Sequence, residues 1–83
     1  MNAYPFVTIY GKPTCIYTSR AINLCHEYNH PCRPIYLTAE QMALCQNKYG
    51  HYSAPVCVDC YPDHEELIGG SDNLEDYLQE LYD

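Results

Sequence analysis

The chain is organised around one short segment, Lys12-Pro13-Thr14-Cys15-Ile16-Tyr17-Thr18-Ser19-Arg20. The apolar alternating run Phe6-Val7-Thr8-Ile9-Tyr10 precedes it, and a segment with helical spacing follows it. This pattern predicts that Cys15 lies at a junction between a strand and a helix. The first turn of a helix offers free backbone N–H groups and the positive end of the helix dipole, and both favour thiolate over thiol. The position therefore predicts a reactive cysteine, because the thiolate is the nucleophile in disulfide exchange.

The neighbours of Cys15 favour the same interpretation. Lys12 and Arg20 supply positive charge, and if Cys15 is the N-cap, the amide and hydroxyl of Thr18 lie where they could donate to the sulfur. The alternative is that Cys15 is a small buried residue, as many free cysteines are. The cations and the donors make a reactive thiol the better hypothesis.

Length and cysteine content bound the class of protein. The 83 residues predict one small domain spanning residues 1–83. The six cysteines could form the disulfide framework of a secreted protein. However, the first ten residues have neither the basic nor the apolar region of a signal peptide, and no segment is long enough to cross a membrane. We therefore expect a soluble cytoplasmic protein with mostly reduced thiols. We also expect a monomer.

Charge is divided unevenly along the chain. Residues 1–48 hold all four Lys and Arg against two acids, a balance of +2, whereas residues 49–83 hold nine acids and no Lys or Arg, a balance of -9. Nucleic acids and anionic membranes require clustered basic residues, so neither is expected as a partner. An anionic substrate would depend on Lys12 and Arg20, which are two of the four cations and flank Cys15.

Hydrophobic spacing and breaker residues predict the order β-α-β-α-β-β-α, a small α/β domain with a mixed sheet flanked by helices. Pro34 suggests that the second strand lies at an edge of the sheet. Thr38 and Gln41 have the spacing of a capping box, and Gly50 is a stop signal for that helix. The predicted strands are 6–10, 32–37, 56–58 and 64–68, and the predicted helices follow Cys15, Thr38 and Gly70.

The first and last predicted helices each have an apolar face. That of the first helix predicts that Cys25 is a core residue rather than a chemical group. Acids at the start of the last helix suit its positive end. The two apolar faces are formed by Ala21, Leu24, Cys25 and Tyr28, and by Leu74, Tyr77, Leu78 and Leu81.

With these elements in order, the chain resembles a glutaredoxin over nearly its whole length. Four parts carry the resemblance: the segment around Cys15, Gly50-His51-Tyr52-Ser53-Ala54-Pro55, the following strand Val56-Cys57-Val58, and Ile68-Gly69-Gly70-Ser71-Asp72-Asn73-Leu74. Each part is weak alone, but the combination is specific. The resemblance implies a thioredoxin-like (glutaredoxin) fold and a glutathione-dependent thiol–disulfide oxidoreductase, with glutathione as co-substrate and no metal.

The resemblance also implies a role for particular residues. Pro55 would carry a cis peptide bond and bring the backbone of Ala54 beside Cys15, where it can pair with glutathione in the manner of a β-strand. Gly70, Ser71 and Asp72 would bind the γ-glutamyl carboxylate at the start of the last helix. Lys12 would contact the glycyl carboxylate and Tyr17 would line the groove, with Thr18 and Arg20 in support. The partners would be glutathionylated or disulfide-containing proteins, among them ribonucleotide reductase as one candidate.

The chain departs from the family pattern at Thr18. Dithiol members have Cys-Pro-Tyr-Cys where this chain has Cys15-Ile16-Tyr17-Thr18, so an intramolecular disulfide cannot form there. The one-cysteine route through Cys15 remains. The residues leave open whether Thr18 is natural or an engineered replacement of a resolving cysteine, and whether Cys57 or Cys60 resolves instead.

Two alternative hypotheses assign the chain to other functional classes. The first is a module that binds glutathione or a redox partner through the same groove without turnover. The second is a zinc-binding adaptor, because Cys57, Cys60 and His64 are ligand types. Strand alternation places positions 57 and 60 on opposite faces unless a turn begins between them. No second Cys-x-x-Cys completes the ligand set, so no metal site is expected.

Overall fold

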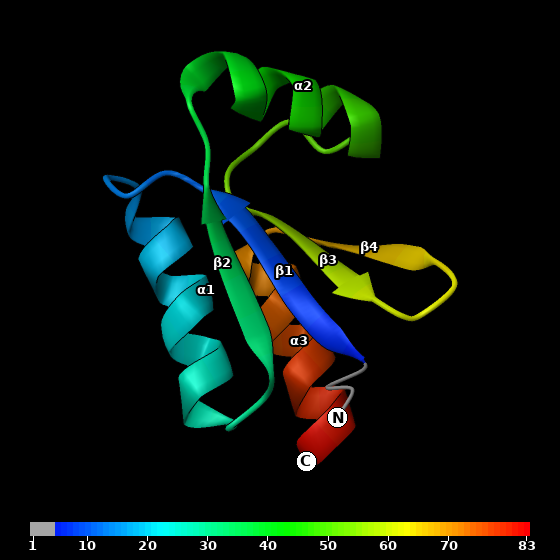
Figure 1. The fold of residues 1–83 in the computed structure, drawn as a ribbon. Helices are drawn as coiled ribbons and strands as arrows, with labels where there is room; N and C mark the ends of the chain where they lie inside the picture. Colours follow the sequence, from blue (N-terminus) through cyan, green and yellow to red (C-terminus); the bar gives the residue numbers. More distant parts are fainter. Residues whose placement is uncertain (1–4) are drawn as a thin grey trace.

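The predicted element order is confirmed by a computed structural model that describes residues 5–83 (Figure 1). Residues 1–4 of the predicted domain lie outside this described part. The chain runs through β1 (Phe6–Gly11), α1 (Ile16–Glu27), β2 (Cys32–Tyr36), α2 (Ala39–Tyr49), β3 (Val56–Cys60), β4 (Glu65–Gly69) and α3 (Ser71–Tyr82).

The four strands form one mixed sheet in the order β2-β1-β3-β4. β1 and β2 are parallel, whereas β3 is antiparallel to both β1 and β4. Pro34 lies on the edge strand β2 opposite Ile9, as its missing N–H predicts. The βαβ unit therefore places the β1–α1 loop, which contains Cys15, at the same sheet end as the connection from β2 to α2.

Helices cover the two faces of the sheet unequally. Figure 1 shows α1 and α3 against one face, and α2 across the end of the other. Between α1, α3 and the sheet lies the larger core, built on Val7, Ile9, Ala21, Leu24, Cys25, Cys57, Leu74 and Leu78. A smaller core under α2 contains Met42, Val56, Val58 and Cys60.

Local signals fix the helix ends. The Thr38 side chain accepts from the Gln41 N–H while the Gln41 side chain accepts from the Thr38 N–H, so the predicted capping box is confirmed. Gly50 ends α2 with φ 68°, a left-handed conformation that suits glycine. Leu81 differs from its predicted place on the apolar face: it is 52% exposed, because the last turn of α3 extends past the strands (Figure 1).

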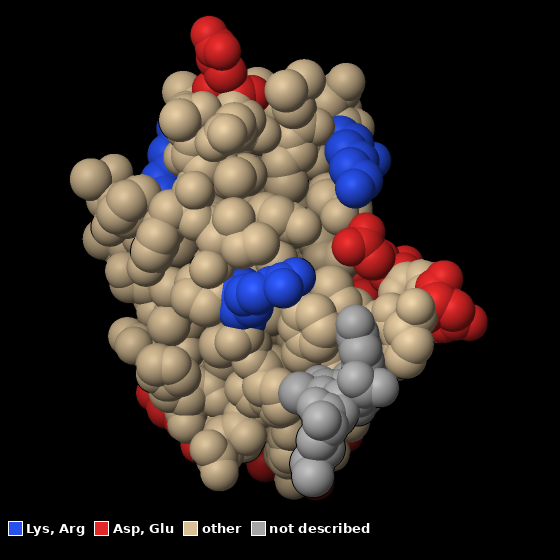
Figure 2. Space-filling model, in the orientation of Figure 1, with Lys and Arg blue, Asp and Glu red and all other residues tan. Residues whose placement is uncertain are grey.

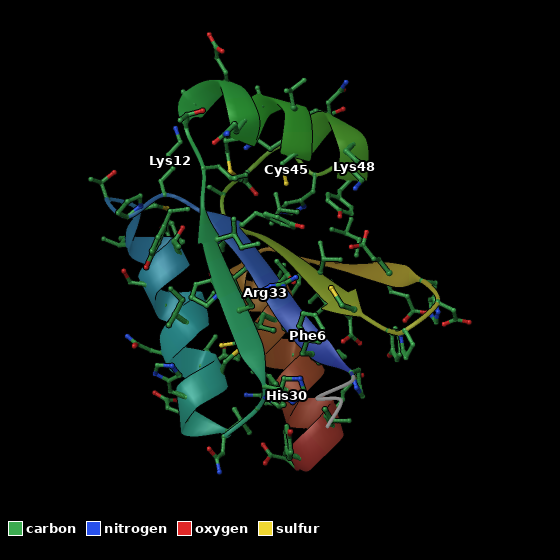
Figure 3. All side chains as sticks on the ribbon, viewed as in Figure 1. Phe6, Lys12, His30, Arg33, Cys45 and Lys48 are labelled. Carbon is green, nitrogen blue, oxygen red and sulfur yellow. The ribbon has the colours of Figure 1, made fainter. Side chains whose placement is uncertain are left out.

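Positive side chains are dispersed on the face of the molecule that Figure 2 shows. Lys12, Arg33 and Lys48 lie apart from one another, and acidic surface lies directly beside Lys48 (Figures 2 and 3). Arg33 covers the Phe6 ring at 5.1 Å from its centroid, and Lys48 lies 5.0 Å from the centroid of Tyr49. Within residues 5–83, no helix has both the length and the apolar character required to span a bilayer.

Candidate functional site

Cys15 is the N-cap of α1, at the end of the loop that leaves β1. Its backbone is extended, with φ -88° and ψ 121°, and its carbonyl accepts from Ser19 N–H at 3.3 Å. The Cys15 N–H donates to the Lys12 carbonyl at 3.1 Å, which closes the preceding loop into a turn. The half-buried sulfur therefore lies at the positive end of a helix of 12 residues.

The surroundings of Cys15 favour its thiolate. Burial raises the pKa of Cys15, but hydrogen bonds from the backbone and side chain of Thr18 and from the Tyr17 backbone, together with the charge of Lys12, outweigh it. The net effect is a pKa lowered from its ordinary value. Because these donors bind the charged form, they stabilise the nucleophilic state of the sulfur.

Thr18 is a buried part of this arrangement rather than an exposed helix residue. Its side chain is 1% exposed and its hydroxyl oxygen accepts from the Lys12 N–H at 3.3 Å. The hydroxyl thus connects the loop before Cys15 to the first turn of α1, while it also donates to the sulfur. Thr18 positions the loop and tunes the thiol at once.

A cleft of about 240 Å³ lies beside this helix start. Three segments that are distant in the sequence meet there: the first turn of α1, the loop before β3 and the first turn of α3. Five of the predicted site residues line it, namely Tyr17, Ala54, Gly70, Ser71 and Asp72. Sequence reasoning missed the other three lining residues, His51, Ser53 and Asn73.

The missed residues shape the cleft through side-chain contacts. The Ser53 hydroxyl lies 3.0 Å from His51 Nε2, and a Cβ atom added to Gly70 would lie 3.5 Å from the same nitrogen. His51 and Ser53 belong to the Gly50–Pro55 segment that carries the resemblance. Their place in this segment was the signal from which a position at the site could have been predicted. Asn73 has a different signal, because Gly70 and Asn73 have the N-cap and N3 spacing of a helix start.

At the start of α3, one of the expected donors is already occupied. Gly70 is the N-cap of this helix, and its N–H donates to the Asn73 side-chain oxygen at 3.0 Å. Gly69 has φ 123° and lies so close to Asn73 that an added Cβ would overlap its amide group. The N–H groups of Ser71 and Asp72 belong to the first turn, where helices lack internal partners. These two groups, rather than Gly70, can bind an anion.

Arg20 differs from its expected role. Its guanidinium crosses from α1 to α3 and donates to Asp72 at 2.8 Å, to Glu75 at 2.7 Å and to the Ser71 hydroxyl at 3.0 Å. It is held by carboxylates and clamps the two helices, so Lys12 is the cation whose charge lowers the pKa of Cys15. The sequence could not show this, because the partners lie more than 50 residues away.

The remaining predicted residues border the site. Pro55 is fully buried at the start of β3, and the Ala54–Pro55 peptide bond is cis, as the resemblance implies. Lys12 projects from the β1–α1 loop on the side of α2 (Figure 3). Neither residue lines the cleft itself.

Cys57, Cys60 and His64 do not form the ligand cage that the zinc hypothesis requires. Cys57 belongs to the core under α1 and α3, whereas Cys60 belongs to the core under α2, so no turn begins between them and the two lie on opposite faces of the sheet. β3 thus extends to Cys60, past the predicted strand 56–58. His64 instead contacts Asp63 at 2.7 Å and stacks on Tyr61. Over residues 5–83, no three His, Cys, Asp or Glu side chains are grouped as metal ligands.

The site thus combines a thiol of lowered pKa, a cleft of about 240 Å³ and two backbone N–H groups that can bind an anion. No protein-family model, curated protein or solved structure matches the chain. The chemistry of these residues therefore carries the functional conclusion.

Proposed function

We propose that this chain is a glutaredoxin of thioredoxin-like fold, which reduces glutathione mixed disulfides through Cys15. The observation that carries the proposal is the Cys15 thiol itself, which has a lowered pKa at a helix N-terminus, two residues before a side chain that lines the cleft. The βαβ unit, the β3–β4 hairpin and the terminal helix support the fold assignment.

The reaction requires one protein thiol. The Cys15 thiolate attacks the glutathione sulfur of a mixed disulfide, and the bond to the substrate sulfur breaks. The substrate leaves as a thiolate that takes a proton from water. A second glutathione thiolate then attacks the glutathione sulfur bound to Cys15, which releases glutathione disulfide and restores the Cys15 thiolate. Thr18 cannot compete as a resolving group, so the glutathione adduct persists until the second glutathione arrives.

The cleft supplies contacts for both ends of glutathione. The γ-glutamyl carboxylate binds the N–H groups of Ser71 and Asp72 at the start of α3, with the helix dipole in support. The extended backbone pairs with that of Ala54, and the Tyr17 ring forms one wall. The glycyl carboxylate is bound by Lys12, which lies outside the cleft lining but close enough to Cys15 for its charge to act on the thiol. Arg20 contributes indirectly, because it holds the Ser71 and Asp72 side chains in place.

A deglutathionylation assay tests the proposal. Wild-type protein should release glutathione from a glutathionylated peptide in the presence of reduced glutathione, and Cys15→Ser should return the rate to that of the uncatalysed reaction. Cys45→Ser is the matched control, because Cys45 lies on α2, in the separate core under that helix, and should leave the rate unchanged.

Two results would contradict the proposal. Activity that survives Cys15→Ser would show that Cys15 is not the nucleophile. Glutathione binding without turnover in the wild-type protein would instead identify a non-catalytic binding module. Mass analysis of the protein after incubation with glutathione disulfide separates these cases, since the catalytic mechanism requires an adduct on Cys15.

A further inference from the structure

Three other cysteines converge in the main core, on the sheet face covered by α1 and α3. Cys25 and Cys57 are fully buried there, and the half-buried Cys32 packs against the same cluster. The sheet register explains this arrangement. Cys32 is the β2 neighbour of Val7 and Cys57 is the β3 neighbour of Ile9, and both of these β1 residues point into this core.

Of the two pairs that include the half-buried Cys32, only Cys25–Cys32 can form a disulfide. Cys32 and Cys57 lie on strands separated by β1, so their Cα atoms are roughly two strand spacings apart, about 9.6 Å. A disulfide requires Cα atoms within about 7 Å. Cys25 and Cys32, in contrast, pack in the same cluster, and the Cys32 side chain acts directly on the Cys25 thiol. The chain between them is short and tight, with His30 N–H donating to the Cys25 carbonyl at 2.9 Å.

This pair is remote from the site already described. Cys15 and Cys25 lie at opposite ends of α1, and ten residues of helix correspond to about 15 Å. Cys25 and Cys32 also line none of the cleft beside Cys15.

We propose that Cys25 and Cys32 form a second, independent thiol–disulfide site, which low-molecular-weight disulfides such as glutathione disulfide oxidise to an intramolecular bond. The inference does not depend on the function proposed for Cys15. It follows from the packing of Cys25 against Cys32, from the separation imposed by β1 and from the partial exposure of Cys32.

The order of the steps follows from access. Cys32 is half-buried, whereas Cys25 is 0% exposed, so the external disulfide reaches Cys32 first. The Cys32 thiolate attacks glutathione disulfide, forms a mixed disulfide and releases one glutathione thiolate. Cys25 then loses its proton, attacks the Cys32 sulfur and displaces the second glutathione thiolate, which takes up the proton. Two protein thiols are oxidised and one glutathione disulfide is reduced to two glutathiones.

The state of Cys25 sets the rate of the second step. Burial, together with the neighbouring Cys32 and Cys57 thiols, raises the pKa of Cys25 well above its ordinary value. The attack by Cys25 should therefore accelerate as the pH rises, because only the thiolate is nucleophilic.

The test uses the full chain with Cys15→Ser, so that the proposed catalytic thiol takes no part. After incubation with glutathione disulfide, intact mass should show the loss of two hydrogen atoms. Cleavage after Glu27 separates Cys25 from Cys32, so the two fragments should remain joined until a reductant is added. Adding Cys25→Ser should leave a stable glutathione adduct on Cys32, and adding Cys57→Ala should leave the bond intact.

Several results would overturn the proposal. They are a stable Cys32 adduct with Cys25 present, a bond between Cys32 and Cys57, or no reaction at Cys32 over the same period in which exposed thiols react. If a core variant fails to fold, the fragment analysis of the Cys15→Ser protein still decides the matter. A missing Cys25–Cys32 bond leaves the deglutathionylation activity of wild-type Cys15 untouched, so failures of the two proposals are distinguishable.

Discussion

Thr18 lies directly against Gly11, so closely that a Cβ atom added to Gly11 would overlap the Thr18 side chain. Gly11 is the last residue of β1 and Thr18 is in the first turn of α1, so this contact sets how the helix that starts at Cys15 meets the sheet. The same Thr18 hydroxyl lowers the pKa of Cys15. The glycine therefore allows the close approach that brings a hydrogen-bond donor to the sulfur.

Gly11→Ala should destabilise the fold and should also raise the pKa of Cys15. Overpacking of this kind costs about 1–3 kcal/mol, and displacement of Thr18 removes its donation to Cys15. Gly50→Ala is the control, because Gly50 has φ 68° and nothing within 4 Å, so it should cost about 1–2 kcal/mol through backbone conformation alone. Urea unfolding and the pH dependence of alkylation measure the two effects. An unchanged alkylation profile in Gly11→Ala would refute the coupling.

Thr18→Val should raise the pKa of Cys15, because the nearly isosteric side chain lacks the hydroxyl that donates to the thiolate. A hydrogen bond to a charged group of roughly 1.5–3 kcal/mol corresponds to a shift of about one to two pH units. The midpoint of the alkylation rate against pH should move upward by that amount. Ser19→Ala, at an exposed position one residue further on, should leave the midpoint in place. Equal midpoints for the two variants would show that the Thr18 hydroxyl does not lower the pKa of Cys15.

Tyr77→Phe should destabilise the protein through Asp59. This carboxylate is 2% exposed, and its Oδ2 accepts from the Tyr61 and Tyr77 hydroxyls at 2.8 Å each. Loss of one donor to a buried carboxylate costs about 1–3 kcal/mol. Tyr52→Phe is the control, since that hydroxyl donates to Asn47 on the surface and its removal should change stability by at most about 0.5 kcal/mol. Similar unfolding free energies for the two variants would show that Tyr77 does not stabilise Asp59.

Much of the fold could be predicted because its signals are local. The capping box at Thr38, the stop at Gly50 and the edge proline Pro34 each act within a few residues of themselves. The helix start at Cys15 is of the same kind, since a strand pattern ends and a helical pattern begins beside it. Such features need no knowledge of what the chain later packs against.

The rest of the site depends on contacts between distant segments. Arg20 was expected near the sulfur because it is near in the sequence, but the acids of α3 offer it closer partners. The occupation of the Gly70 N–H by Asn73 was missed because the resemblance assigned Gly70, together with Ser71 and Asp72, to the binding of an anion. The contact between Cys25 and Cys32 depends on how α1 packs against β2, and helical periodicity showed only that Cys25 is buried.

His30 should make the stability of the protein fall in mild acid. The ring is 7% exposed, its Nδ1 lies 2.6 Å from the Tyr82 hydroxyl, and its Nε2 is buried without a partner among residues 5–83. Burial lowers the pKa of His30, although the charge of Asp59 opposes this effect. The unfolded chain therefore binds a proton that the folded chain resists, so the stability present above about pH 6.5 is lost as the pH falls below that value.

Urea unfolding at about pH 7.5 and about pH 5.5 tests this on either side of the ordinary histidine pKa. The wild-type protein should lose more stability between the two than His30→Gln does, by at most about 1.4 kcal/mol in total, because the lower pH lies about one unit below the ordinary histidine pKa. His26→Gln is the control, because His26 is exposed on α1. The pKa of His64, which its hydrogen bond to Asp63 raises, acts in the opposite direction but equally in all three proteins. A pH dependence that is the same in His30→Gln and the wild type would show that the buried ring is not the group that resists protonation.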